Sequence, residues 1–183
     1  FGGGLDLAIK ENNRYTFRHF FTKTFGQRRT RAIIEDSNGW IWVGNSDGVY
    51  VFSPDSLQAD PQNYLTYNYN NGKLRSNEIK CIYQDTQNRI WIGSSGGGLS
   101  MCIPGTDYHN LTFKHYGTSN GLVNDMVQAI AEDKQGNLWI ATEYGISRFN
   151  PETQAFDNYF FSAYTLGNVY SDNSSCVSKN GSL

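Results

Sequence analysis

The chain has 183 residues, a formal net charge of -2 and a pI near 5.9, and 38% of its residues are hydrophobic. Such a chain can build a buried core, which excludes a disordered tail. The charge balance gives no basic surface for nucleic acid or for an anionic membrane, and no apolar run approaches the roughly 18 residues of a membrane-spanning helix. We therefore expect no nucleic-acid partner and no membrane contact for this segment.

The first residues, "GGGLDLAIKENNRYTFRHF", match a later stretch, "GGGLSMCIPGTDYHNLTFKHY". Both stretches alternate apolar and polar residues on either side of a turn, as antiparallel strands do. Residues 1–30 are thus expected to supply the outer two strands of a repeat and a linker.

One order of features then recurs three times, in "EDSNGWIWVGNSDGVYVFSPD", "QDTQNRIWIGSSGGGLSMCIPGT" and "EDKQGNLWIATEYGISRFNPET". An Asp and a Trp keep their places in each copy, and both markers step by 49 and then 48 residues. They are Asp36, Asp85 and Asp133, and Trp42, Trp91 and Trp139. A constant period of this length indicates a repeat architecture.

Each repeat predicts four strands. In the first, "RAIIED" and "GWIWVG" are strands joined by a tight hairpin, "GVYVF" is a third strand that ends before Pro54, and "YLTYNYN" is a fourth. Four antiparallel strands in roughly 48 residues are typical of a propeller blade. We predict an all-β fold, a partial β-propeller of about four blades. The blades are expected at 31–78, 79–126 and 127–168, with the inner strands of a last blade at 169–183.

The repeated residues are interpreted as scaffold. The Trp side chains are expected to fill the wedges between blades, and the Asp side chains to accept backbone N–H groups at the corner between the first two strands. Ala32, Cys81 and Ala129 share one aligned position, where blades converge and only small side chains fit. Because Cys81 and Cys102 should lie two strands apart in one sheet, we expect buried free thiols rather than a disulfide.

The pattern "EDxxGxxWxG" followed by "GxxxFxP", with "NGL"-type linkers, resembles the two-component regulator propeller repeat over essentially the whole chain. That family typically forms seven-bladed propellers in the periplasmic sensor regions of hybrid histidine kinases. There the repeats recognise oligosaccharides released from polysaccharides. The resemblance implies a periplasmic, ligand-sensing segment that is not itself an enzyme, in a parent protein that carries the kinase.

The residue spacing of the chain does not fit known enzymatic or metal-binding motifs. A sialidase-type Asp box needs Asp-x-Gly with Trp three residues on, whereas this chain has Asp-x-x-Gly-x-x-Trp. "SSGGGLS" lies between two strands, without the helix and the Lys-Ser/Thr of a phosphate loop. His19, His109 and His115 are scattered, without metal-ligand spacing, and no Ser, His and Asp are brought together by spacing. We expect no cofactor, no metal and no catalytic residue.

A ligand is expected at the end of the propeller where the linkers between blades and the loops between second and third strands emerge, because such loops vary without disturbing the scaffold. The candidates carry the carboxamides, carboxylates and aromatic plane that suit sugars. They are Arg28, Arg29, Asn45, Asp47, Asn77, Glu78, Asn124, Asp125, Glu143 and Tyr144, with Ser95 beside them. The arginines of "GQRRTR" favour an acidic or sulfated sugar, unless they pair with Glu78 and Asp125 across blades.

Two other functions stay open. The segment could be a scaffold for protein–protein interaction or receptor dimerisation, or a fragment of a propeller glycoside hydrolase or lyase. The first and last residues look like complementary halves of a blade, and an open arc exposes strand edges and apolar faces. We therefore also expect the chain to self-associate, most simply as a two-fold dimer.

Overall fold

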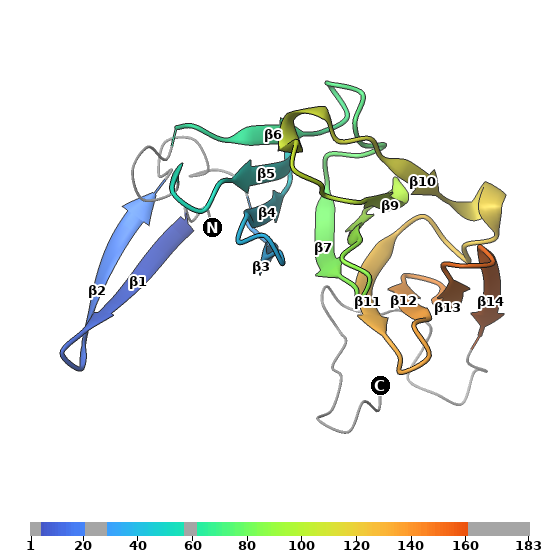
Figure 1. Cartoon of the computed structure of the whole chain (residues 1–183). Coiled ribbons are helices and arrows are strands. Elements are labelled where there is room, and N and C mark those ends of the chain that lie inside the picture. Colours follow the sequence, from blue (N-terminus) through green and yellow to red (C-terminus); the bar gives the residue numbers. More distant parts are fainter. Residues whose placement is uncertain (1–4, 21–28, 57–61, 161–183) are drawn as a thin grey trace.

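In the computed structural model, which describes residues 5–20, 29–56 and 62–160, a two-stranded hairpin is followed by three four-stranded antiparallel sheets (Figure 1). This confirms the predicted β-propeller segment. The inner strands expected at 169–183 lie outside the described residues. No helix in the described ranges is long and apolar enough to span a membrane.

The strands follow the repeat. The hairpin consists of β1 (Leu5–Glu11) and β2 (Arg14–Phe20). The first blade holds β3 (Ala32–Glu35), β4 (Ile41–Asn45), β5 (Gly48–Phe52) and β6 (Leu65–Tyr67). The second holds β7 (Ile79–Gln84), β8 (Ile90–Ser94), β9 (Gly98–Cys102) and β10 (Lys114–Tyr116). The third holds β11 (Val127–Glu132), β12 (Leu138–Thr142), β13 (Gly145–Asn150) and β14 (Ala155–Tyr159). Two short 3-10 turns, η1 (Tyr108–Asn110) and η2 (Thr118–Asn120), flank β10.

The blades stand side by side around an arc, and their inner strands β3, β7 and β11 pack against one another (Figure 1). Within every blade the strands pair in sequence order, so that each blade is an up-and-down meander. The inner strands β7 and β11 carry a register irregularity at the same aligned place, between Ile79 and Cys81 and between Val127 and Ala129. The repeat therefore extends to local backbone geometry.

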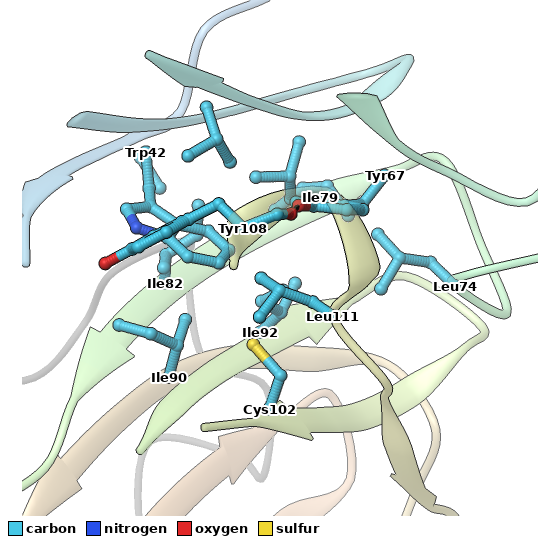
Figure 2. Close-up of a cluster of buried hydrophobic side chains, with 13 residues drawn as sticks. Trp42, Tyr67, Leu74, Ile79, Ile82, Ile90, Ile92, Cys102, Tyr108 and Leu111 are labelled. Carbon is cyan, nitrogen blue, oxygen red and sulfur yellow. Dashed lines mark hydrogen bonds between the residues drawn. The ribbon is translucent and has the colours of Figure 1, made fainter. Parts of the chain in front are cut away.

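The hydrophobic cores lie between blades. Trp42 of the first blade is fully buried in a cluster with Ile82, Ile90 and Ile92 of the second blade (Figure 2). Trp91 of the second blade is fully buried in the equivalent cluster against the third. Each cluster removes apolar surface of both sheets from water, so the contact between neighbouring blades stabilises the arc.

The outward sides of the first and third blades differ from these covered faces. In β12, Leu138 and Ile140 face the second blade, so Trp139 between them points to the opposite side, where it is half-buried and stacks on Tyr159 at 5.5 Å between ring centroids. At the other end, Ile33 is 53% exposed, whereas its counterparts Ile82 and Ile130 are buried. The outward face of the first blade is exposed only in part, because Val43, Tyr50 and Phe52 are buried together with Leu5 of the hairpin.

The corner between the first two strands of each blade is built around the repeated Asp. In the first blade, Asp36 Oδ1 accepts the backbone N–H groups of Asn38 and Trp40, each at 2.9 Å, and Asp36 Oδ2 accepts the indole N–H of Trp42 at 2.8 Å. The same three bonds recur around Asp85 and Asp133. The Asp-to-Trp spacing of six residues thus lets one carboxylate close the turn and orient the ring. The hydrogen bond from the indole to the Asp was not predicted from the sequence.

Each corner also has a residue with a positive φ, three positions after the repeated Asp. Gly39 (φ 81°), Asn88 (φ 61°) and Gly136 (φ 78°) all lie in the left-handed region. Gly adopts this conformation at no steric cost and Asn tolerates it. The corner therefore accepts Gly or Asn, which is the variation that the three repeats show.

The carboxyl group of Asp133 makes the third corner sensitive to acid. Desolvation opposes its ionisation, but hydrogen bonds from the Trp139 indole and from Asn137 and Gln135 outweigh it, so the pKa of Asp133 lies below its ordinary value of 3.8. A lowered pKa in the folded state contributes stability above the unfolded value, and this contribution is lost as the pH falls through the folded value. We expect the Asp133 carboxyl carbon to titrate below pH 3.8 by NMR, and Asp133→Asn to flatten the loss of unfolding free energy in acid. Titration at or above 3.8 would contradict this account.

The cysteines behave as expected. Cys81 on β7 and Cys102 on β9 are buried and form no disulfide, and β8 separates their two strands in one sheet. Burial raises the pKa of the Cys102 thiol, so it stays protonated. Both side chains act as small core residues.

Candidate ligand-binding rim

One end of the blades carries a set of loops and linkers, here called the rim: 29–31, 45–48, 68–78, 94–98, 117–126 and 142–145. Loops and linkers alternate along it and bond to one another. Gly96 and Gly98 donate their N–H groups to the carbonyl of Asp125 at 3.0 Å, and the Glu143 N–H donates to the carbonyl of Met126 at 3.1 Å. The rim is therefore an ordered surface, fixed on the scaffold of the blades.

Two predicted ligand residues hold the linkers of the rim in shape. Asn77 Oδ1 accepts the backbone N–H of Tyr69 at 2.8 Å, and Asp125 Oδ1 accepts the backbone N–H of Thr118 at the same distance. Asn124 also works locally, because its Oδ1 accepts the N–H of Met126 at 2.8 Å. These side chains lie at the rim, as expected, but much of their hydrogen-bonding capacity is used within it.

The charged candidates fall into two groups. Arg31, the last arginine of "GQRRTR", donates to Glu78 Oε2 of the next blade at 2.7 Å, so cross-blade pairing occurs for this arginine. Arg29 is exposed beside it, and Arg28 lies outside the described residues. Glu143 Oε1 accepts the amide of Gln128 at 3.1 Å and is still half-exposed. Arg29, Glu78 and Glu143 thus present charge at the rim.

The loop of the first blade corrects one expectation. Asn45 is fully buried, and its Oδ1 accepts the N–H of Asp47 at 2.6 Å, so its carboxamide has no surface for a ligand. Thr142 in the third blade has the equivalent place and accepts the N–H of Tyr144 through Oγ1. The last residue of the second strand of these two blades thus accepts a backbone N–H of the following loop and is not available to bind a ligand. Asp47 itself accepts the Tyr50 hydroxyl at 2.8 Å.

Two exposed aromatic rings stand out on the rim. Tyr144, which was predicted, is 64% exposed in the loop between β12 and β13. Tyr69, which was not predicted, is equally exposed in the linker between β6 and β7. The sequence does mark Tyr69 as a candidate. The aligned position of the next linker holds Thr118, so the repeat itself does not require an aromatic residue there.

The nearest approach to catalytic chemistry is a Ser–His pair, which spacing alone did not indicate. Ser100 Oγ and His115 Nδ1 are 2.9 Å apart on the paired strands β9 and β10. Burial, with a smaller effect of nearby Arg75, lowers the pKa of His115. Ser100 is only 2% exposed, so its hydroxyl has almost no surface from which to attack a substrate. Among the described residues no group of three or more His, Cys, Asp or Glu could hold a metal ion.

The fold defines a β-propeller segment with a loop-lined rim at one end of its blades. Three stretches match the family model of the two component regulator propeller, at residues 25–47, 73–96 and 121–144. These three stretches are therefore similar to the two-component regulator propeller repeat, and they carry the Asp and Trp positions of the sequence pattern.

Known relatives agree with this similarity. The chain is similar to the extracellular domain of a protein assigned to a hybrid two-component system of B. thetaiotaomicron, with 25% identity and a TM-score of 0.81 over 98% of this chain and 23% of that one. A second such domain from the same organism gives 23% identity and a TM-score of 0.72 over 99% of this chain and 25% of that one. Histidine kinase P4 of Formosa agariphila is 23% identical over 80% of this chain and 10% of the kinase. The chain thus spans a quarter or less of each of these relatives.

Proposed function

We propose that the chain is the ligand-sensing part of a periplasmic sensor region in a hybrid histidine kinase, and that it binds oligosaccharides without transforming them. The repeat family and the relatedness to extracellular domains of two-component systems support a sensor role. The observation that carries the ligand class is the composition of the rim. The rim carries charged groups on Arg29, Glu78 and Glu143 and exposed aromatic rings on ordered loops.

This arrangement suits sugars for physical reasons. Hydroxyl groups both donate and accept hydrogen bonds, so a surface with guanidinium donors and carboxylate acceptors matches them. Aromatic rings pack on the C–H faces of sugar rings, which removes apolar surface from water. The pairing of Arg31 with Glu78 offsets part of the positive charge, so an acidic or sulfated sugar is recognised through Arg29 rather than through a wholly basic surface.

The test uses the 183-residue chain and a panel of defined oligosaccharides, neutral, uronic and sulfated, first by thermal shift and then by calorimetry. Substituting Arg29, Glu143 and Tyr144 together by Ala is expected to weaken binding of the responding sugar by about tenfold or more, since three contacts of about 0.5 to 1.5 kcal/mol are removed. Lys134→Ala, an exposed change at the opposite end of the third blade, is the control. Unchanged affinity of the triple variant would remove these residues from the site.

We also propose self-association through blade faces as a second role of the segment. The outward faces of the first and third blades expose Ile33 and Trp139, at positions that are covered inside the arc. Surfaces of this kind mark protein–protein contacts. Such a contact would join receptor chains without touching the rim, so that sugar binding and dimerisation use different surfaces.

A further inference from the structure

We infer that Tyr69 is the stacking platform of the rim, and that the sugar it takes presents an apolar C–H face of a pyranose ring. The inference rests on the proposed function and specifies which residue makes the central contact. Single exposed aromatic residues are ordinary on protein surfaces. Tyr69 differs from such residues in how firmly its backbone is held and in where the repeat places it.

The linker that carries Tyr69 is closed by its own hydrogen bonds. Asn68 and Asn71 bond reciprocally, each backbone N–H donating to the other's Oδ1 at 3.0 and 2.9 Å. The Tyr69 N–H donates to Asn77, and its carbonyl accepts the N–H of Gly72 at 3.0 Å. Leu74 is buried in the core between the first two blades and anchors the end of the loop. The backbone at Tyr69 is therefore ordered before any ligand arrives.

The next linker has the same frame with a different residue at this position. The Thr118 N–H donates to Asp125 as the Tyr69 N–H donates to Asn77, and Leu122 is buried in the way that Leu74 is. Thr118 turns its hydroxyl back onto Asp125 at 3.2 Å, whereas Tyr69 extends its ring into solvent. In a repeat protein the features common to both linkers are scaffold. The exposed ring that occurs in only one of them needs another explanation.

The linker that carries Tyr69 lies between two loops of the rim. A Cβ atom on Gly48 would come within 2.6 Å of the Asn68 side chain, and one on Gly97 within 2.8 Å of the Ser76 side chain. The linker is thus in close contact with the loop of the first blade on one side and with that of the second on the other. A ligand that stacks on Tyr69 would therefore lie on the same rim as the polar groups of the loops at 45–48 and 94–98.

The chemistry of the ring selects the ligand class. Tyr supplies a large, rigid, amphipathic contact with only two side-chain torsions to fix, and an ordered loop lowers the entropic cost of binding further. A pyranose with its hydroxyls mostly equatorial offers a flat C–H face to such a ring and directs its hydroxyls sideways, toward polar neighbours. Stacking on the ring face requires the aromatic ring and not the phenol hydroxyl.

The experiment compares Tyr69→Ala and Tyr69→Phe in the 183-residue chain. Calorimetry is run with four hexasaccharides: a β-1,4-glucan, a β-1,4-xylan, an oligogalacturonate and a sulfated galactan. For the probe that binds the wild-type chain, we expect Tyr69→Ala to weaken affinity by about tenfold or more and Tyr69→Phe to stay within about threefold. Tyr15→Ala is the matched control, because Tyr15 is 60% exposed on β2, away from the rim. With 3-fluorotyrosine in the chain, the resonance that Tyr69→Phe removes should shift on adding the probe.

The outcomes separate the inference from the function on which it rests. Because the ring is exposed, Tyr69→Ala should keep the wild-type unfolding midpoint, so a loss of binding is not a loss of folding. If a probe binds and Tyr69→Ala binds it equally well, the inference is wrong and the sensor function stands. If Phe fails as Ala does, the hydroxyl rather than the ring makes the contact, and stacking is excluded. If none of the four probes binds, the proposed oligosaccharide function fails for this chain and the inference fails with it.

Discussion

Trp91→Ala should lower the free energy of unfolding by about 3 to 5 kcal/mol, the usual cost of truncating a fully buried aromatic side chain. The Trp91 ring is completely buried between the second and third blades. It meets Phe149 edge-on at 5.7 Å between ring centroids, and its indole N–H donates to Asp85 Oδ2 at 2.7 Å. The substitution removes the filling of the wedge and one bond of the corner at once. Urea denaturation followed by circular dichroism measures the change.

Trp139→Ala is the matched control for this prediction. It deletes the same side chain at the same repeat position and breaks the same indole bond, to Asp133 at 2.9 Å. Within one chain the ring is half-buried and faces away from the second blade, so only about 1 to 2 kcal/mol should be lost when both Trp variants are compared in an Ile33→Glu background, which removes the expected dimer contact. Equal losses for the two variants would show that the corner bond, and not the wedge between blades, makes the Trp important.

The scaffold was predictable from sequence because its determinants are local and repeated. Asp85, Asn88 and Trp91 lie within seven consecutive residues, and one tight turn brings them together. Three copies at a fixed period then identify which features the fold requires. The strand bounds follow from the same alternation, which is why the four-stranded blades agree with the structure.

The rim was less predictable, because the use of each polar side chain depends on how the backbone of its loop is folded. Asn77 accepts a hydrogen bond from a residue eight positions away, and nothing in the residue type distinguishes that role from recognition of a sugar. Asn45 is buried because it is the last residue of its strand and caps the loop that follows. Ser100 and His115 meet through the register of β9 and β10, which a long connection hides from sequence reasoning.

We expect the chain to form a dimer in solution. The chain itself shows how two blade faces fit, because the Trp42 side of the first blade packs on Ile82 and its neighbours in the second. The outward face of the third blade presents Trp139, and that of the first presents Ile33, the counterpart of Ile82. Val43 and Phe52 on the face of the first blade are already buried with Leu5 of the hairpin, so Trp139 of one copy can pack on the part of this face of another copy that Ile33 leaves exposed. Two such contacts, related by a two-fold axis, close a ring.

Light scattering coupled to size exclusion at micromolar concentration should give twice the 20.6 kDa of one chain. Ile33→Glu should return the mass to that of a monomer, because a charge cannot be buried unpaired in the new interface. The substitution is tolerated in the fold, since Ile33 is 53% exposed within one chain. Ile103→Glu, at a side chain 63% exposed beyond β9, adds the same charge away from both faces and should leave the dimer intact. A monomeric wild-type chain, or a dimer that survives Ile33→Glu, would show that these faces do not bind each other.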